Sequence, residues 1–377
     1  MMRTVGLCMI VRDEQHIIRR CLDSVRPLID YVLIVDTGSK DQTQDVVREW
    51  LVENQVPGEI IEEPWRDFAY NRTHALACLR KRTEIDFAFI MDADDVLVLD
   101  EGFDPAAFKS RLRKEHYRVE LRLGRIRYWR PLLCRNDLEF RFRGVLHEFL
   151  EAPIGVGPAA TVSGFHVMCN QQQGARSRDP KKYQKDAQIL EQALLDEQDP
   201  HMRSRYIFCL AQSYRDCGEA QKALDRYLER AGQGYWDEEV FYSLYQAARL
   251  QERLGYPEDQ ILDTYRQATQ AKPSRAEARH GASRFCRRKK RFEEGFVFSR
   301  DALSQERPET GLFLADWVYE YGFLDELAVN GYWSGHYREA LEACIILLAD
   351  RVMPAADRSR IRKNALLILT KLDKADH

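Results

Sequence analysis

The chain has 377 residues, of which 45% are hydrophobic and 31% are charged, a composition typical of globular proteins with hydrophobic cores. This composition excludes a disordered chain, and at about 150 residues per domain the length predicts roughly two or three domains. The 57 basic and 60 acidic residues give a net charge of −3, so the overall charge does not favour nucleic acid or a membrane surface as a partner.

Every apolar run is much shorter than the ~20 residues that a membrane span requires, and residues 1–4 lead directly into a strand-like segment. We therefore expect neither a spanning helix nor a secretory signal. The nine cysteines are scattered and form no Cys-x-x-Cys pair. Such usage is typical of buried free thiols in a reducing cytoplasm, so we expect a cytoplasmic protein without a disulfide framework or a zinc site.

Strands and helices alternate up to about Gly174. Strands are predicted at residues 5–11, 31–35, 59–62 and 87–91, and helices at residues 13–25, in a segment ending at Leu51, and at residues 71–82. Short apolar strands separated by helices predict a mainly parallel sheet covered on both faces. Ligands bind beyond the carboxyl ends of such strands. Because the polar clusters 12–14, 36–39 and 92–95 each follow a strand, we expect one cleft to receive all three.

From about Pro180 the strand pattern stops and helical runs follow, separated by turn residues such as Gly218 and Gly255. A helix rich in small residues, a turn and an Ala-Leu helix recur about every 34 to 37 residues, which is the period of helix-turn-helix solenoid repeats. Residues 332–341 look like one more copy. The alternative is an ordinary helical domain whose spacing is accidental.

The segment Asp92-Ala93-Asp94-Asp95 is the sharpest local signal. Two carboxylates at positions i and i+2, on a turn after a buried strand, suit one hard divalent cation. Such a cation bridges diphosphate oxygens and neutralises charge on a leaving nucleotide. The alternative is a solvated acidic turn, because a single Asp-x-Asp is common. The preceding strand and the two other polar clusters favour a nucleotide-diphosphate site.

Two further clusters suit a nucleotide ligand. Gly38 permits a tight turn, and the Asp36 carboxylate is placed to accept hydrogen bonds from a base or ribose; the alternative is a helix N-cap at Ser39 or Asp41. Near the start of the helix predicted at residues 71–82, Arg72 suits diphosphate recognition through paired donors. The alternative for Arg72 is a surface ion pair.

The segment 111–143 holds eleven Lys or Arg against four Asp or Glu, with tyrosine, tryptophan and phenylalanine between them. This composition suits nucleic acid, but it equally suits the phosphates of a donor or an acidic acceptor. A solvated strand face is the alternative, and given the overall charge we expect no nucleic-acid partner.

Candidates for proton transfer and for a further metal ligand come later. His147 and Glu148 are residue types that take a proton from an acceptor nucleophile. His166, at the end of a strand predicted at residues 161–166, suits the shell of a cation. Each residue of this kind, taken alone, more often has a structural role. Residues 169–178 are polar and contain a glycine, which predicts a mobile lid.

Taken together, residues 3 to about 166 resemble a family 2 glycosyltransferase with the GT-A fold. The resemblance depends on three motifs in the expected order, at residues 6–14, 35–43 and 91–94. A helical-repeat half after such a domain is similar to the tetratricopeptide-bearing branch, which includes peptide S-glycosyltransferases acting on bacteriocin precursors. The implied fold class is an α/β GT-A domain with a Rossmann-like mixed sheet over residues 1–175, followed by an all-α tetratricopeptide-like (TPR-like) domain over residues 176–377.

The resemblance also implies site residues. It implies that a UDP-sugar is held by Val11, Arg12, Glu14, Asp36, Ser39, Arg72, Asp92 and Ala93. Asp94 would ligate Mn or Mg, with Asp92 and His166 in the shell of the metal. Thr37 replaces the second of two adjacent acids that the family often has before Gly-Ser, so recognition of the base would depend on Asp36 alone.

The catalytic base is less clearly implied. Glu148 occupies the place of the family's catalytic acid pair, but the usual Glu-Asp is here His147-Glu148. The base therefore stays open between these two residues.

We therefore predict a metal-dependent, inverting glycosyltransferase that moves a hexose or N-acetylhexosamine from a UDP-sugar to an acceptor hydroxyl or thiol. The acceptor, a peptide, protein or glycan, attacks the anomeric carbon from the face opposite UDP, and the metal stabilises the departing diphosphate. The helical half presents a surface to the acceptor or forms a homodimer. The alternative is a non-catalytic TPR-like scaffold that retains a UDP-sugar-binding domain.

Overall fold

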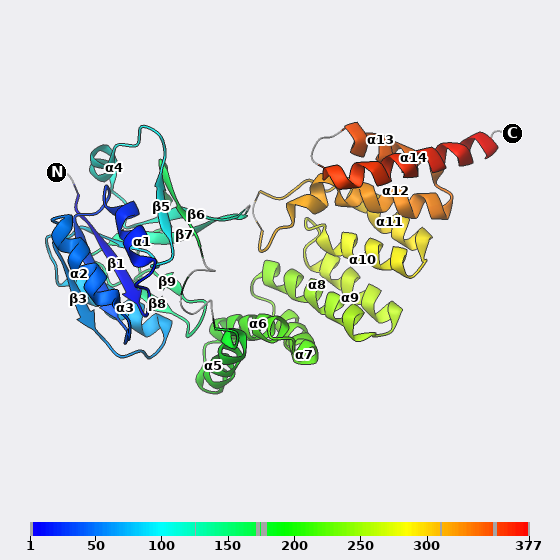
Figure 1. Ribbon diagram of the computed structural model, residues 1–377. Coiled ribbons are helices and arrows are strands. Elements are labelled where there is room, and N and C mark those ends of the chain that lie inside the picture. Colours follow the sequence, from blue (N-terminus) through cyan, green and yellow to red (C-terminus); the bar gives the residue numbers. More distant parts are fainter. Residues whose placement is uncertain are drawn as a thin grey trace. The chain divides into compact units, whose positions relative to one another are not determined.

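The computed structural model describes residues 3–124, 126–170, 174, 179–309, 311–349 and 353–375. The chain divides into two compact units, Met1–Ala193 and Leu194–His377, which Figure 1 draws from blue to green and from green to red. This division falls within helix α5 (Lys182–Asp196). The domain boundary expected after residue 175 stays a prediction.

The first unit alternates strands and helices as the sequence predicts. Its elements are β1 (Val5–Val11), α1 (Ile18–Val25), β2 (Tyr31–Asp36), α2 (Thr43–Glu53), β3 (Gly58–Glu62), α3 (Phe68–Arg80), β4 (Phe87–Ile90), β5 (Val96–Leu99), α4 (Pro105–Arg111), β6 (His116–Leu123), β7 (Ile126–Arg135), β8 (Arg141–Arg143), β9 (Phe149–Glu151), β10 (Ala160–Thr161) and β11 (Phe165–Met168), before α5.

Most strands of the first unit form one mixed sheet in the order β3-β2-β1-β4-β7-β6-β11-β5, with β10 beside β6; β8 and β9 pair separately. Strands β3, β2, β1 and β4 are parallel, whereas β7 is antiparallel to β4 and to β6, and β5 is antiparallel to β11. The sheet is thus less parallel than the expected mainly parallel one. The carboxyl ends of β1, β2 and β4 lie at one edge, which brings the three polar clusters together.

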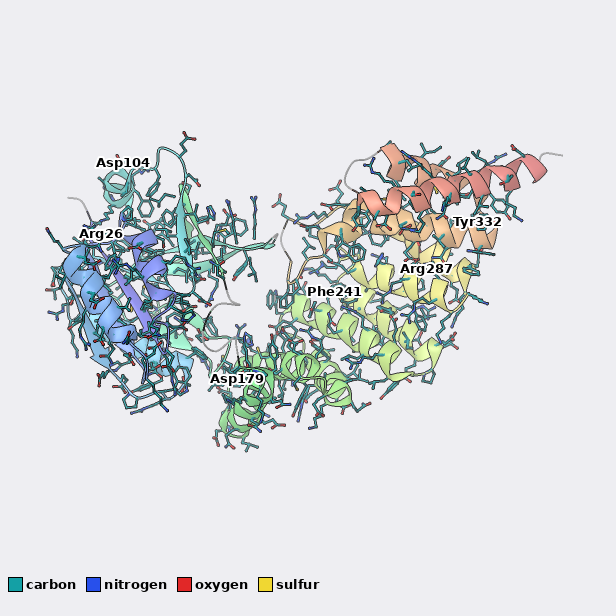
Figure 2. All side chains as sticks on the ribbon, in the orientation of Figure 1. Arg26, Asp104, Asp179, Phe241, Arg287 and Tyr332 are labelled. Carbon is teal, nitrogen blue, oxygen red and sulfur yellow. The ribbon has the colours of Figure 1, made fainter. Side chains whose placement is uncertain are left out.

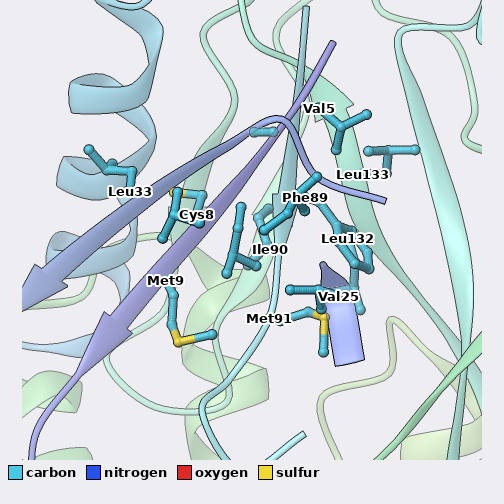
Figure 3. Packing of buried hydrophobic residues seen from close by; sticks show 14 of the residues in the cluster. Val5, Cys8, Met9, Val25, Leu33, Phe89, Ile90, Met91, Leu132 and Leu133 are labelled. Atoms are coloured by element: carbon cyan, nitrogen blue, oxygen red, sulfur yellow. The ribbon is translucent and has the colours of Figure 1, made fainter. Parts of the chain in front are cut away.

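The core of this unit fixes that edge. Every residue of β2 and nearly every residue of β1 is buried, as expected for strands covered on both faces. Figure 3 shows how residues of β1, β4 and β7 pack, including Met9, Phe89 and Leu133. Phe89 and Leu133 are fully buried and lie opposite each other in the β4–β7 ladder. Close packing of this kind leaves little freedom to the turns that follow the strands.

The cysteines agree with the sequence prediction. All nine are free, and all except the half-buried Cys217 are buried. Burial raises the pKa of the Cys134 thiol to about 12, so this thiol stays protonated at neutral pH and behaves as a small hydrophobic side chain.

The second unit is helical in the part of it that the structure describes. Its elements are α6 (Pro200–Asp216), α7 (Ala220–Ala231), α8 (Asp237–Leu254), α9 (Glu258–Ala271), α10 (Glu277–Arg288), α11 (Phe292–Ala302), the π-helical turn η2 (Val318–Gly322), α12 (Phe323–Ser334), α13 (Tyr337–Ala349) and α14 (Ala355–Ala375).

Consecutive helices of the second unit pack against one another (Figure 1). Gly218, Gly255 and Gly335 follow the ends of α6, α8 and α12 in the left-handed conformation, where glycine carries no Cβ penalty. The fold class predicted from the sequence, an α/β domain followed by TPR-like helical repeats, is confirmed.

Within the described ranges, we find no helix that combines the length and the apolar character needed to cross a membrane.

Candidate functional site

A cavity of about 730 Å³ lies in the first unit, at the edge of the sheet where β1, β2 and β4 end. Of the residues that the sequence predicts as site residues, the following line it: Val11, Arg12, Glu14, Arg72, Asp92, Ala93, Asp94 and His147. Asp36, Ser39, Glu148 and His166 are not among the lining residues. The structure thus brings most of the predicted donor site together and leaves four members outside the surface of the cavity.

Ser39 has a structural role behind the cavity lining, where it supports the backbone of Asp13. Its Oγ accepts a hydrogen bond of 2.9 Å from the backbone N–H of Asp13, and Asp13 Oδ1 in turn accepts one of 2.7 Å from the N–H of Lys40. The Oγ of Thr43 accepts from the N–H of Glu14 at 2.8 Å. These bonds tie the loop after β1 to the loop after β2, and they hold Asp13 in the left-handed region at φ 58°.

Asp36 is only 1% exposed at the end of β2. Its Oδ1 accepts hydrogen bonds from the N–H groups of Gly38 at 2.8 Å and Ser39 at 2.7 Å. Its Oδ2 is buried and has no hydrogen-bond partner among the described residues. The next residue, Thr37, lines the cavity and donates to the carbonyl of Val11 at 3.0 Å. A buried acceptor without a partner beside a cavity favours a ligand or water that donates to it.

Arg72 joins two carboxylates. Its Nε donates to Glu148 at 2.8 Å and a terminal nitrogen donates to Asp92 at 2.6 Å, and the residue is 8% exposed. Burial acts to raise the pKa of Asp92, but the charge and hydrogen bond of Arg72 outweigh it and leave this pKa below its usual range. Asp92 is thus held as a carboxylate at neutral pH.

The other two acids of this turn behave in the opposite way. Asp95 is 7% exposed, and burial together with the charges of Asp92 and Asp94 raises its pKa to about 8. Burial, followed by the charge of Asp92, also raises the pKa of Asp94. Three carboxylates therefore lie close together in one wall of the cavity, and the positive charge near Asp94 and Asp95 does not balance their negative charge. This arrangement favours a cation there.

His147 and Glu148 are neighbours in the chain but face different surroundings. His147 is exposed, lines the cavity and adopts a φ of 53°. The side chain of Glu148 is 10% exposed and is paired with Arg72. Of the two candidate bases, His147 is the one that contacts the cavity in this conformation.

The structure does not bring His166 to the acid cluster. His166 lies on β11 opposite Val98 of β5, and it is not among the residues that line the cavity. Its Nδ1 is 4.0 Å from Asp100, and burial, with help from Arg122, lowers its pKa. The predicted metal role of His166 stays a prediction. In the described ranges, no three His, Cys, Asp or Glu residues are arranged to hold a metal ion.

Several lining residues were not predicted as site residues. Trp65 and Phe68 form one wall, with their rings edge to face at 4.7 Å. Tyr128 and Arg130 of β7 form another, and both lie in the basic, aromatic segment that the sequence singled out.

Helix α5 contributes a third wall that no sequence signal indicated. Lys182 and Lys185 line it, and Lys185 Nζ lies 2.6 Å from Asp179, which is labelled in Figure 2. Of the predicted lid, residues 171–173 and 175–178 lie outside the described residues, whereas Gly174 lines the cavity beside Asp94.

Parts of this chain are similar to known proteins. Residues 7–100 match the family model described as Glycosyl transferase family 2. A TPR repeat-containing protein of Synechococcus elongatus is 31% identical over 158 residues, which are 40% of this chain and 36% of that relative. The match therefore spans little more than a third of the relative's length.

Two solved structures are also similar to this chain. Staphylococcus aureus TarS, residues 1–349, in complex with UDP-GlcNAc is 14% identical and has a TM-score of 0.40, covering 71% of this chain and 91% of that one. BtubC from P. vanneervenii is 16% identical and has a TM-score of 0.37, covering 48% and 73%. From its motifs, its sheet and the family match, the N-terminal part of the chain is a glycosyl transferase family 2 domain, and TPR-like helices follow it.

Proposed function

We propose that this protein transfers a hexose or N-acetylhexosamine from a UDP-sugar to a hydroxyl or thiol of an acceptor, with inversion at the anomeric carbon. The observation that carries the proposal is the cavity at the carboxyl ends of β1, β2 and β4, which gathers Asp92, Asp94 and Arg72 within a family 2 domain. Ligand sites in such sheets lie at this edge.

The nucleoside end of the donor is best accommodated beside β1 and β2. The buried Asp36 Oδ2 is an acceptor with no partner among the described residues, and uracil carries one N–H donor on the ring edge that it would present there. Thr37 and Val11, at the cavity surface next to Asp36, would flank the base or ribose.

The acid cluster would hold Mn or Mg. Carboxylate oxygens are ligands that these hard cations prefer, and the raised pKa values of Asp94 and Asp95 indicate a deficit of positive charge at this wall. Because no three-residue ligand set is found in the described ranges, the donor phosphates and water would complete the shell. A cation there offsets the charge that develops on the leaving diphosphate.

The acceptor would be deprotonated by His147 or Glu148. His147 contacts the cavity directly, whereas Glu148 would first have to loosen its pairing with Arg72. A base must lie within hydrogen-bond reach of the proton it takes, although such bonds often tighten only in the complex with substrate. His147→Gln and Glu148→Gln, measured side by side, decide between them: the variant of the base loses transfer and keeps UDP binding.

The acceptor we propose is a peptide, protein or glycan that the TPR-like unit helps to bind, since such repeats offer extended binding surfaces. The nine free cysteines suit a reducing compartment, and we propose that the protein acts in the cytoplasm. A homodimer through the helical unit stays a prediction.

The proposal is tested by measuring hydrolysis of a panel of UDP-sugars with and without Mn²⁺. We expect the wild type to hydrolyse at least one of them in a metal-dependent manner, and Asp94→Asn to lower this turnover by at least a hundredfold. Asp45→Asn is the matched control, because Asp45 is an exposed helix residue paired with Arg48 outside the cavity. Binding of UDP and Mn²⁺ without turnover by any donor would favour the scaffold alternative, and absence of binding would refute the proposal.

A further inference from the structure

Arg72 is held rigidly at the start of α3. The helix is capped by Asp67, whose side chain accepts a hydrogen bond of 2.8 Å from the N–H of Tyr70. The Arg72 guanidinium lies 6.0 Å from the ring centre of Phe68 and 5.6 Å from that of Phe142. A capped helix and two aromatic neighbours leave this long side chain little rotamer freedom.

The two carboxylates that Arg72 binds belong to opposite sides of the proposed reaction. Asp92, at 2.6 Å, sits on the turn that would hold the cation and donor diphosphate. Glu148, at 2.8 Å, sits in the segment that offers the candidate bases. Different nitrogens of one guanidinium make the two bonds, Nε to Glu148 and a terminal nitrogen to Asp92.

This arrangement needs the planar fork of arginine. A guanidinium presents donors in fixed directions, whereas the ammonium of lysine is a compact point charge on a flexible stem. Lysine at position 72 would keep the charge but would not bridge both carboxylates in this geometry. The sequence prediction, in which Arg72 binds the diphosphate, assigns its donors to a ligand, yet two of them are already committed to protein carboxylates.

We propose that Arg72 is a positioning residue, which orients Asp92 on the donor side and Glu148 on the acceptor side together and thereby couples the two. This inference rests on the proposed function. Its consequence is that loss of the bridge lowers the rate of transfer while the affinity for the nucleotide stays nearly unchanged. A residue that binds the diphosphate directly would show the opposite pattern.

The test compares Arg72→Lys and Arg72→Met with the wild type. Affinity is measured by calorimetric titration with UDP in the presence of Mn²⁺, and kcat and KM with the UDP-sugar that the wild type turns over. We expect UDP affinity and KM within about threefold of the wild type, kcat at least tenfold lower, and no rescue by lysine. In the Arg72→Met background, Glu148→Gln should cost little more, because the two residues act as a unit.

The matched control is Arg82→Met. Like Arg72, Arg82 makes two hydrogen bonds to carboxylate oxygens, but both belong to Glu59, and Arg82 lies outside the cavity lining. It should leave kcat and KM unchanged. Circular dichroism establishes that each variant folds. If Arg72→Met fails to fold, the double variant Arg72→Met/Glu148→Gln replaces it, because the neutral glutamine removes one of the two buried carboxylate charges that lose their partner.

Three results would overturn the inference. A tenfold loss of UDP affinity in Arg72→Met would assign Arg72 to direct donor binding, and an unchanged kcat in folded Arg72→Met would leave it a purely structural role; both leave the proposed function intact. A wild type that neither binds UDP nor turns over any UDP-sugar would remove the proposed function and this inference with it.

Discussion

At Gly174 there is no room for a side chain beside the Asp94 carboxylate. A Cβ at this position would lie 2.9 Å from Asp94 Oδ2 and 3.7 Å from Glu14 Oε1. Gly174→Ala would therefore push the Asp94 carboxylate away from its present position, at little cost to the fold because this carboxylate is the far end of a side chain. We expect Mn²⁺-dependent UDP binding, measured by calorimetry, to weaken roughly tenfold, with little change in thermal stability.

The control for this prediction is Gly157→Ala in the same unit. A Cβ at Gly157 would meet nothing within 4 Å, so UDP binding and stability should both stay as in the wild type. Equal UDP affinity in Gly174→Ala and the wild type would show that the position of Asp94 does not matter for the nucleotide.

For individual site residues, the sequence predicts contacts only where the order and direction of the strands fix them. Asp92 and Arg12 come together because each follows a parallel strand, and parallel strands end at one edge. The place of His166, by contrast, is set by the antiparallel register of β11 on β5. No local pattern encodes that register. The hydrogen bond between Arg72 and Glu148, which are 76 residues apart in the chain, could not be predicted from a local pattern either.

Elements were predicted well where burial is continuous and poorly where it alternates. The strands expected at residues 5–11 and 31–35 are β1 and β2 almost to the residue. The segment 111–143 was interpreted as a basic surface, with a solvated strand face as the alternative, and it contains β6 and β7 in the middle of the sheet. In β6, Tyr117 and Val119 are buried and Arg118 is exposed, so its charges face outward while its apolar side chains join the core.

Buried ion pairs hold helices of the second unit together. Arg275 is 1% exposed, and its guanidinium binds Glu238 of α8, Glu277 of α10 and the carbonyl of Leu312. Removing one partner of such a network leaves buried charges uncompensated. We expect Arg275→Met to lower the free energy of unfolding by about 3–5 kcal/mol, measured by urea denaturation.

Arg266→Met is the matched control for that substitution. Arg266 is 45% exposed and pairs with Asp263 one turn away, and an exposed pair of this kind contributes about 0–1 kcal/mol. A similar loss of stability in both variants would mean that the buried network of Arg275 is no stronger than a surface pair.

At the scale of the whole molecule, the sequence predicts a change of architecture but not its details. The shift from alternating strands to helices with a repeat near 34–37 residues is visible because helix and strand periods differ. The longer connection between α11 and α12 was not predicted. In the structure it is held by Arg275 and by Tyr319, which donates to Glu277 at 2.9 Å, contacts that no periodicity reveals.

The second unit also carries a titratable group that we expect to make its stability depend on pH. His280 of α10 is 5% exposed, with the rings of Trp317 and Phe323 at 4.9 and 5.9 Å. Burial, aided by the charges of Arg284 and Arg287, lowers its pKa to about 3. In the unfolded chain a histidine has a pKa of about 6.5.

The sign of the effect follows from proton binding. Between about pH 6.5 and pH 3 the unfolded chain binds a proton at His280 that the native unit does not, so stability falls as the pH falls, by up to ~1.4 kcal/mol per pH unit. His280→Gln should remove this part of the slope.

The measurement is urea unfolding between pH 7 and pH 4, with hydrogen exchange of residues 194–377 to assign the transition to the second unit. His201→Gln, at an exposed histidine beside Tyr235, should keep the wild-type slope. If the slopes of His280→Gln and the wild type coincide, His280 binds its proton equally well in the native and the unfolded state. The surrounding aromatic and arginine side chains would then not prevent its protonation.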